Sequence, residues 1–183
     1  MTALLVLLAA AVAWALLRRY ALGFLAQRPR DYAGTAPAFE LGRHLAGPMR
    51  CEGVIYGPTG RVSTRFVAEM TGAWDETGGR LAESFRYASG GVQRREWRIT
   101  PGTGGRFTAR AEDVQGEATG ETCGATAVMR YRLRLPREAG GWLLDVTDWL
   151  YLTEDGVILN RSQFRLYGLP VGELVACIRP AGA

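Results

Sequence analysis

The side chains that could carry out chemistry are few, and their spacing excludes most catalytic and metal sites. The chain of 183 residues has one histidine, His44, so a Ser-His-Asp triad would have to be built around that single imidazole. The three cysteines, Cys51, Cys123 and Cys177, lie far apart, whereas zinc ligands cluster at short spacing. We therefore expect no metal or cofactor, and we interpret the cysteines as unpaired, mostly buried thiols.

Acidic residues are a second source of chemistry, because two carboxyl groups across a cleft can act as general acid and base. Asp145 and Asp148 are three residues apart, so on a strand they point to opposite faces and do not converge. Acids from different strands can still meet. One hypothesis is therefore an enzyme acting on membrane lipid, with Glu117, Asp148 and Arg161 as acid, base and charge clamp.

The charge of the chain is concentrated at the N-terminus. There are 22 basic residues, all arginine, and 18 acidic ones, for a formal net charge of +4. Four of the arginines lie within the first 30 residues, so residues 31–183 hold 18 arginines against 18 acids and are formally neutral. Nucleic-acid-binding surfaces are strongly basic, and this balance therefore argues against a nucleic-acid partner.

The N-terminus contains an uninterrupted apolar run, Ala3–Leu17. As a helix it spans about 22 Å, which is shorter than the roughly 30 Å hydrocarbon core of a bilayer. It is either a cleaved export signal or an uncleaved anchor that continues to about Ala26, and we prefer the anchor because no basic residue precedes the run. We expect a membrane helix within residues 1–26, with these side chains near the interface: Trp14, Arg18, Arg19 and Tyr20.

Residues 27–48 form a linker rich in proline and glycine, and residues 49–183 show a period of two. In the clearest strand, 127–135, one face carries Ala127, Met129, Tyr131, Leu133 and Leu135, and the other carries Arg130, Arg132 and Arg134. We expect nine or ten antiparallel strands joined by short turns, which close into a barrel or fold into a sandwich. A parallel sheet is excluded because no crossover helices are present.

Large aromatic side chains in the strands either fill the interior or line a cavity, and the sequence leaves both open. We assign four of them to the lining of a ligand cavity: Trp74, Trp97, Tyr131 and Trp149. Asn160 and Arg161 are our candidates for a polar anchor, because polar side chains within a strand are costly to bury without partners. The alternative for Arg161 is a buried ion pair with Glu117 or Asp148.

Short motifs are spread in order over residues 31–178. They are Asp31-Tyr-Ala-Gly-Thr-Ala-Pro-Ala-Phe-Glu-Leu41, Gly72-Ala-Trp74, Tyr87 with Gly90, Arg95 with Trp97, Ala111-Glu-Asp-Val-Gln-Gly-Glu-Ala118, Asp148-Trp-Leu-Tyr-Leu152, Leu159-Asn-Arg-Ser162, and Gly168 with Gly172-Glu173. This set resembles the DUF3833 family of bacterial envelope lipoproteins of unknown function. The resemblance implies one lipocalin-like barrel held at a bacterial membrane and facing the envelope, and it supplies no catalytic residues.

The attachment to the membrane departs from the family pattern. A lipoprotein carries its lipid on a cysteine just after the apolar run, and here the first cysteine is Cys51. The helix itself would therefore be the anchor. The arginines after it would leave the barrel in the cytoplasm by the positive-inside rule, whereas the resemblance implies the periplasm. We follow the resemblance and predict a single-pass protein of the bacterial inner membrane with a periplasmic barrel.

Together these observations predict an all-β protein, a lipocalin-like antiparallel meander barrel preceded by one N-terminal membrane helix. Its predicted function is to bind or carry an apolar or lipid-like ligand at the cell envelope, with membrane lipid or an apolar small molecule as partner. The alternatives are the enzyme described above and a non-catalytic envelope scaffold with a filled barrel. An interior cavity below about 300 Å³ would exclude the carrier.

Overall fold

A computed structural model describes residues 2–182 of the chain, with residues 18–20 described by their backbone alone. Within this range the chain forms ten strands, preceded by a long helix, α1 (Thr2–Tyr20), two 3-10 turns, η1 (Phe24–Ala26) and η2 (Pro29–Tyr32), and a short helix, α2 (Leu41–His44). The strands are β1 (Gly47–Tyr56), β2 (Val62–Asp75), β3 (Gly78–Tyr87), β4 (Val92–Pro101), β5 (Arg106–Arg110), β6 (Ala118–Cys123), β7 (Thr126–Arg134), β8 (Leu143–Leu152), β9 (Ile158–Leu166) and β10 (Leu169–Pro180). A third 3-10 turn, η3 (Arg137–Ala139), lies between β7 and β8.

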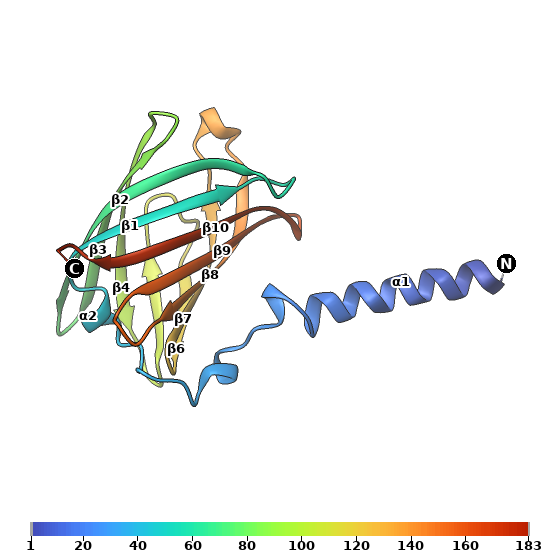
Figure 1. Ribbon diagram of the computed structural model, residues 1–183, viewed down its shortest axis with the longest axis horizontal. Coiled ribbons are helices and arrows are strands. Elements are labelled where there is room, and N and C mark those ends of the chain that lie inside the picture. The colour runs from blue at the N-terminus through green and yellow to red at the C-terminus, as the bar shows by residue number, and fades with distance from the viewer. Residues whose placement is uncertain (1, 183) are drawn as a thin grey trace.

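The strands form one closed barrel in which each strand pairs with its neighbours in the sequence and β1 pairs with β10. Every pairing is antiparallel, and the closing pair runs in register from Met49 opposite Pro180 to Tyr56 opposite Glu173. Figure 1 shows β1, β2, β9 and β10 crossing the front of the barrel as neighbours. The predicted all-β antiparallel barrel is confirmed, and the sandwich is excluded.

The alternation of side chains separates an interior from an exterior. In β7, Tyr131 and Leu133 are buried inside the barrel, whereas Arg130, Arg132 and Arg134 are exposed. Arg132 lies opposite Asp145 of β8 in the register, so acid and base face each other across the outer surface. The predicted strand and the predicted assignment of its two faces agree with the structure to within one residue at each end.

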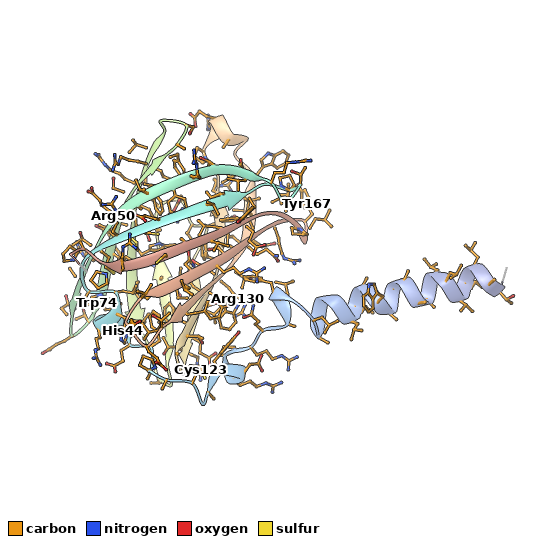
Figure 2. All side chains as sticks on the ribbon, viewed as in Figure 1. His44, Arg50, Trp74, Cys123, Arg130 and Tyr167 are labelled. Carbon is orange, nitrogen blue, oxygen red and sulfur yellow. The ribbon has the colours of Figure 1, made fainter. Side chains whose placement is uncertain are left out.

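The segment before β1 covers one end of the barrel. Phe39 and Leu45, on either side of α2, are both buried, and the Leu45 carbonyl accepts a hydrogen bond of 2.8 Å from Trp74 Nε1. A Cβ atom at Gly72 would collide with that carbonyl, so glycine is required where the segment crosses β2. In Figure 2, Trp74 and His44 mark this covered end, and Tyr167 lies at the opposite end, in the turn between β9 and β10.

The helix α1 projects away from the barrel (Figure 1), but the chain that follows it is packed on the outer wall. The helix stops before Gly23, whose φ of 81° is left-handed, and Phe24 then packs against the buried Trp149 of β8. Gln27 Oε1 accepts hydrogen bonds from the hydroxyl groups of Tyr32 and Tyr151. We call these residues the N-terminal cover: Phe24, Gln27 and Tyr32.

The packing of the N-terminal cover on the barrel shows that the predicted membrane helix is shorter than expected. The helix was expected to continue to Ala26, but it ends at Tyr20 because the following residues turn and pack on the barrel. Among residues 2–182, no helix is long and apolar enough to cross a membrane. This finding overturns the prediction of a single-pass protein of the bacterial inner membrane, whose helix was expected to hold the barrel in the periplasm. The predicted interfacial side chains Arg18, Arg19 and Tyr20 lie outside the described part of the chain.

The burial of Trp149 leads to a prediction about stability. Its side chain is fully buried on the outer wall, between Phe24, Tyr32 and Val128. Replacing Trp149 with alanine should lower the free energy of unfolding by about 3–5 kcal/mol, because the large buried ring leaves a cavity. Urea denaturation measures this change. Trp142→Ala, at a half-exposed tryptophan, is the control and should cost less than about 1.5 kcal/mol. Equal losses in the two variants would contradict the assigned packing.

Candidate ligand-binding site

The interior of the barrel contains a cavity of about 610 Å³. It extends to the hairpins opposite α2, where Pro58, Pro136 and Trp142 contribute to its lining. Most of its wall is aliphatic or aromatic: Ile55, Phe66, Met70, Phe85, Leu133, Leu144, Phe164, Leu174 and Ile178. The interior of this barrel is therefore hollow rather than filled.

Polar side chains gather in the middle of the barrel, at the deep end of this cavity. We call them the polar belt: Glu83, Arg95, Asp113, Asp148, Asn160 and Ser162. Four strands and the connection between β5 and β6 supply them, and the alternation that places Trp97 inside also places Arg95 inside. Glu83, Asp148 and Asn160 also line a second cavity of about 90 Å³ toward α2. The belt therefore separates a large apolar chamber from a small one.

Arg95 is held mainly by Asp113. Its Nε and Nη2 atoms donate to the two carboxylate oxygens of Asp113, with the closest contact at 2.6 Å. Glu83 is farther away, since its Oε2 lies 3.9 Å from Arg95 Nη1. This bidentate geometry is the strong form of the arginine–carboxylate pair, so the positive charge of Arg95 is largely compensated by Asp113.

Glu83 is a buried carboxyl group with incomplete compensation. Its side chain is 10% exposed, and Oε2 is buried without a hydrogen-bond partner among the described residues. Burial raises the pKa of Glu83 from 4.5 to about 7; Arg95 and a hydrogen bond with Trp97 oppose the increase, while Asp148 and Asp113 add to it. Near neutral pH this carboxyl group is thus divided between its charged and neutral forms.

Asp148 is the second buried carboxyl group of the belt, and among the described residues it forms no ion pair. Its Oδ1 atom accepts hydrogen bonds from Ser162 Oγ at 2.7 Å and from Asn160 Nδ2. Burial raises the pKa of Asp148, and these two hydrogen bonds oppose the increase. Burial likewise raises the pKa of the Cys51 thiol, which lines the cavity, to about 12, so this cysteine is protonated and unreactive.

The structure brings three of the six predicted ligand-binding residues into one site. Trp97 and Tyr131 line the cavity with ring centroids 5.1 Å apart in an edge-on arrangement, and Asn160 belongs to the polar belt. Trp74 lies at the covered end. Trp149 and Arg161 lie on the outer wall, where Arg161 pairs with Glu173 and stacks over Phe24, with its Cζ 5.0 Å from the centre of that ring.

The three residues of the enzyme hypothesis do not meet. Asp148 lies inside the barrel, Arg161 lies outside, and Glu117 is exposed and pairs with Arg110 at 3.1 Å. A site built from these three groups is therefore not formed. No group of three histidine, cysteine or acidic side chains within the described residues is arranged to hold a metal ion.

The sequence motifs include Arg95 and Asp113, but neither these two residues nor Glu83 were predicted to line the site. Around Arg95 the sequence reads Gln93-Arg-Arg-Glu-Trp97, with charged side chains on both faces of the strand, so alternation alone does not reveal which face is inside. Only Trp97, two residues from Arg95 and therefore on the same face, indicated that Arg95 points inward.

The raised pKa of Glu83 predicts how stability depends on pH. A carboxyl group whose pKa is higher in the folded state stabilises the fold below its unfolded pKa, and this contribution is lost as the pH rises through about 7. Glu83→Gln should therefore reduce the loss of unfolding free energy between pH 5 and pH 8 by roughly 2–3 kcal/mol. Denaturant melts at both pH values measure it, with exposed Glu76→Gln as control. An unchanged pH dependence in Glu83→Gln would refute the assignment.

Comparison with known proteins places the chain in a family and a fold. Against solved structures, the chain is similar to the S-type phycobiliprotein lyase CPES from Guillardia theta, with a TM-score of 0.60 and 7% sequence identity, over 86% of this chain and 99% of the lyase. At this identity the likeness shows the fold alone. No curated protein sequence matches the chain. A family model described as "Protein of unknown function (DUF3833)" matches residues 19–180. The chain therefore belongs to the DUF3833 family.

Proposed function

We propose that this barrel binds a small apolar or lipid-like molecule inside its cavity. The observation that carries the proposal is the hollow interior of about 610 Å³ with an apolar wall and a compact polar belt at its deep end. Small-molecule sites typically measure about 300–1,000 Å³ and combine apolar walls with a few convergent polar groups. The cavity fits both criteria.

The ligand would contact residues of two kinds. Trp97 and Tyr131 supply flat aromatic surface, and Asn160 together with the rest of the polar belt supplies hydrogen-bonding groups. Apolar contact along the wall would provide most of the binding free energy, because it removes hydrocarbon from water. The belt would fix the orientation of the molecule, since its polar atoms lie at the deep end of the large chamber.

The two alternative functions fit the structure less well. A scaffold with a filled barrel does not account for the cavity, and the three residues of the enzyme hypothesis are divided between the two faces of the sheet. The phycobiliprotein lyase is a precedent for a barrel of this fold in a protein that acts on another molecule.

A pair of adjacent residues on β10 provides the test. Leu174 lines the cavity, and its neighbour Val175 is exposed on the outer face. Leu174→Trp should fill part of the cavity and weaken binding of the neutral apolar dye Nile red at least about tenfold, because dye and indole would compete for the same space. Val175→Trp adds the same indole outside and should leave dye binding unchanged. Fluorescence titration measures both.

The same purified protein allows an independent measurement. Organic extraction followed by mass spectrometry should recover a bound amphiphile from the unmodified chain and less of it from Leu174→Trp. Failure of the unmodified protein to bind Nile red, or equal binding by the two tryptophan variants, would overturn the proposed function.

A further inference from the structure

We propose that the polar belt selects a ligand whose head group is a protonated amine, so that the barrel binds cationic amphiphiles in preference to neutral or anionic ones. This inference rests on the proposed function and names the chemical class of the ligand. It depends on the balance of charges inside the barrel and on one buried oxygen of Glu83 that has no hydrogen-bond partner among the described residues.

The balance of charges in the belt is acidic. It contains three carboxyl groups, from Glu83, Asp113 and Asp148, and one guanidinium group, from Arg95. Because Asp113 pairs with Arg95 through both of its oxygens, Glu83 and Asp148 are left without a full positive partner. A cation between them would offset their cost of burial, whereas a carboxylate head group would add a further negative charge.

The free hydrogen-bonding positions also favour a donor. Glu83 Oε2 is buried without a hydrogen-bond partner among the described residues. On Asp148, both donors, Ser162 Oγ and Asn160 Nδ2, are directed to Oδ1, so Oδ2 remains for a ligand. An ammonium group has three N–H donors and no acceptor, and it therefore matches a pair of carboxylate oxygens better than a hydroxyl or a carboxylate does.

The other ionisable groups around Glu83 do not change the net negative charge of the polar belt. From β1, β3 and β7 they are Cys51, Tyr87 and Tyr131, and burial raises the pKa of each, so all three are neutral. Among the described residues that line the cavity, the second cation is Arg134, which is exposed at the end of β7 and donates to the Gly141 carbonyl. The deep end of the cavity therefore stays acidic.

The pH dependence of binding follows from Glu83. An alkyl amine remains protonated up to about pH 10, but Glu83 carries its full charge only above about pH 7. Below that pH the carboxyl group must release its proton when the amine binds. The affinity for an amine should therefore rise about tenfold between pH 6 and pH 8, while the affinity for a neutral alcohol should not rise.

Three probes with the same twelve-carbon alkyl group separate the possibilities: dodecylamine, dodecanol and dodecanoate, with the amine and the carboxylate below their micelle concentrations and the alcohol below its solubility limit. Displacement of Nile red at pH 8 measures their relative affinities. We expect the amine to bind at least about tenfold more tightly than the alcohol, and dodecanoate to bind most weakly. Glu83→Gln should reduce the preference for the amine and abolish its pH dependence, while Glu76→Gln, at an exposed turn position, should retain both.

The outcomes distinguish the two proposals. If dodecanol or dodecanoate binds as tightly as the amine, and Leu174→Trp still blocks binding, the amine preference is refuted and the proposed function stands. If none of the probes displaces Nile red, or Nile red does not bind, the proposed function fails as well. Circular dichroism establishes that each variant is folded; if Glu83→Gln is not, Asp148→Asn takes its place with the same expected loss of preference.

Discussion

The pairing of β1 with β10 is the constraint on which the rest of the structure depends. It closes the sheet, so every inward side chain is enclosed instead of facing water, and the polar belt exists only because of that enclosure. The seam requires Gly53, since a Cβ atom there would lie 2.6 Å from the Val175 carbonyl and 2.7 Å from Ala176 Cβ. Burial of Glu83 and Asp148, and the changes in their pKa values, follow from closure.

The polar belt lowers the stability of the fold relative to an interior filled with apolar side chains. Buried carboxyl groups without full partners reduce stability, and proteins retain such groups mostly at functional sites. Here the charged residues are arranged unequally: Arg95 is satisfied by Asp113, whereas Glu83 and Asp148 are left incomplete. In a purely structural network we would expect every buried polar group to have its hydrogen-bond or ion-pair partners. The incomplete partners of Glu83 and Asp148 are therefore what connects the interior to ligand binding.

The sequence predicted most strands because one face of each is apolar, as in β7. In β6 such an apolar face is absent, because its inward positions include Ala118 and Gly120, and the Phe107 ring occupies the space that a side chain at Gly120 would need. The sequence could not separate Asp148 from Trp149, since the outer wall at β8 is covered by Phe24 and is as apolar as the interior. The alternation of side chains along a strand distinguishes its two faces, but it identifies the inner face only where the outer face is exposed to solvent.

The N-terminal cover has a consequence for how the chain can be shortened. Beneath Phe24 and Tyr32 lie a fully buried indole at Trp149 and the stacked ring of Tyr151. A chain that begins after residue 32 would keep all of the barrel strands but would lack the N-terminal cover. The apolar patch exposed at Trp149 and Tyr151 would then favour self-association. Shortened versions intended for crystallisation or solution work should therefore start upstream of Phe24, even though no strand precedes Gly47 in the described chain.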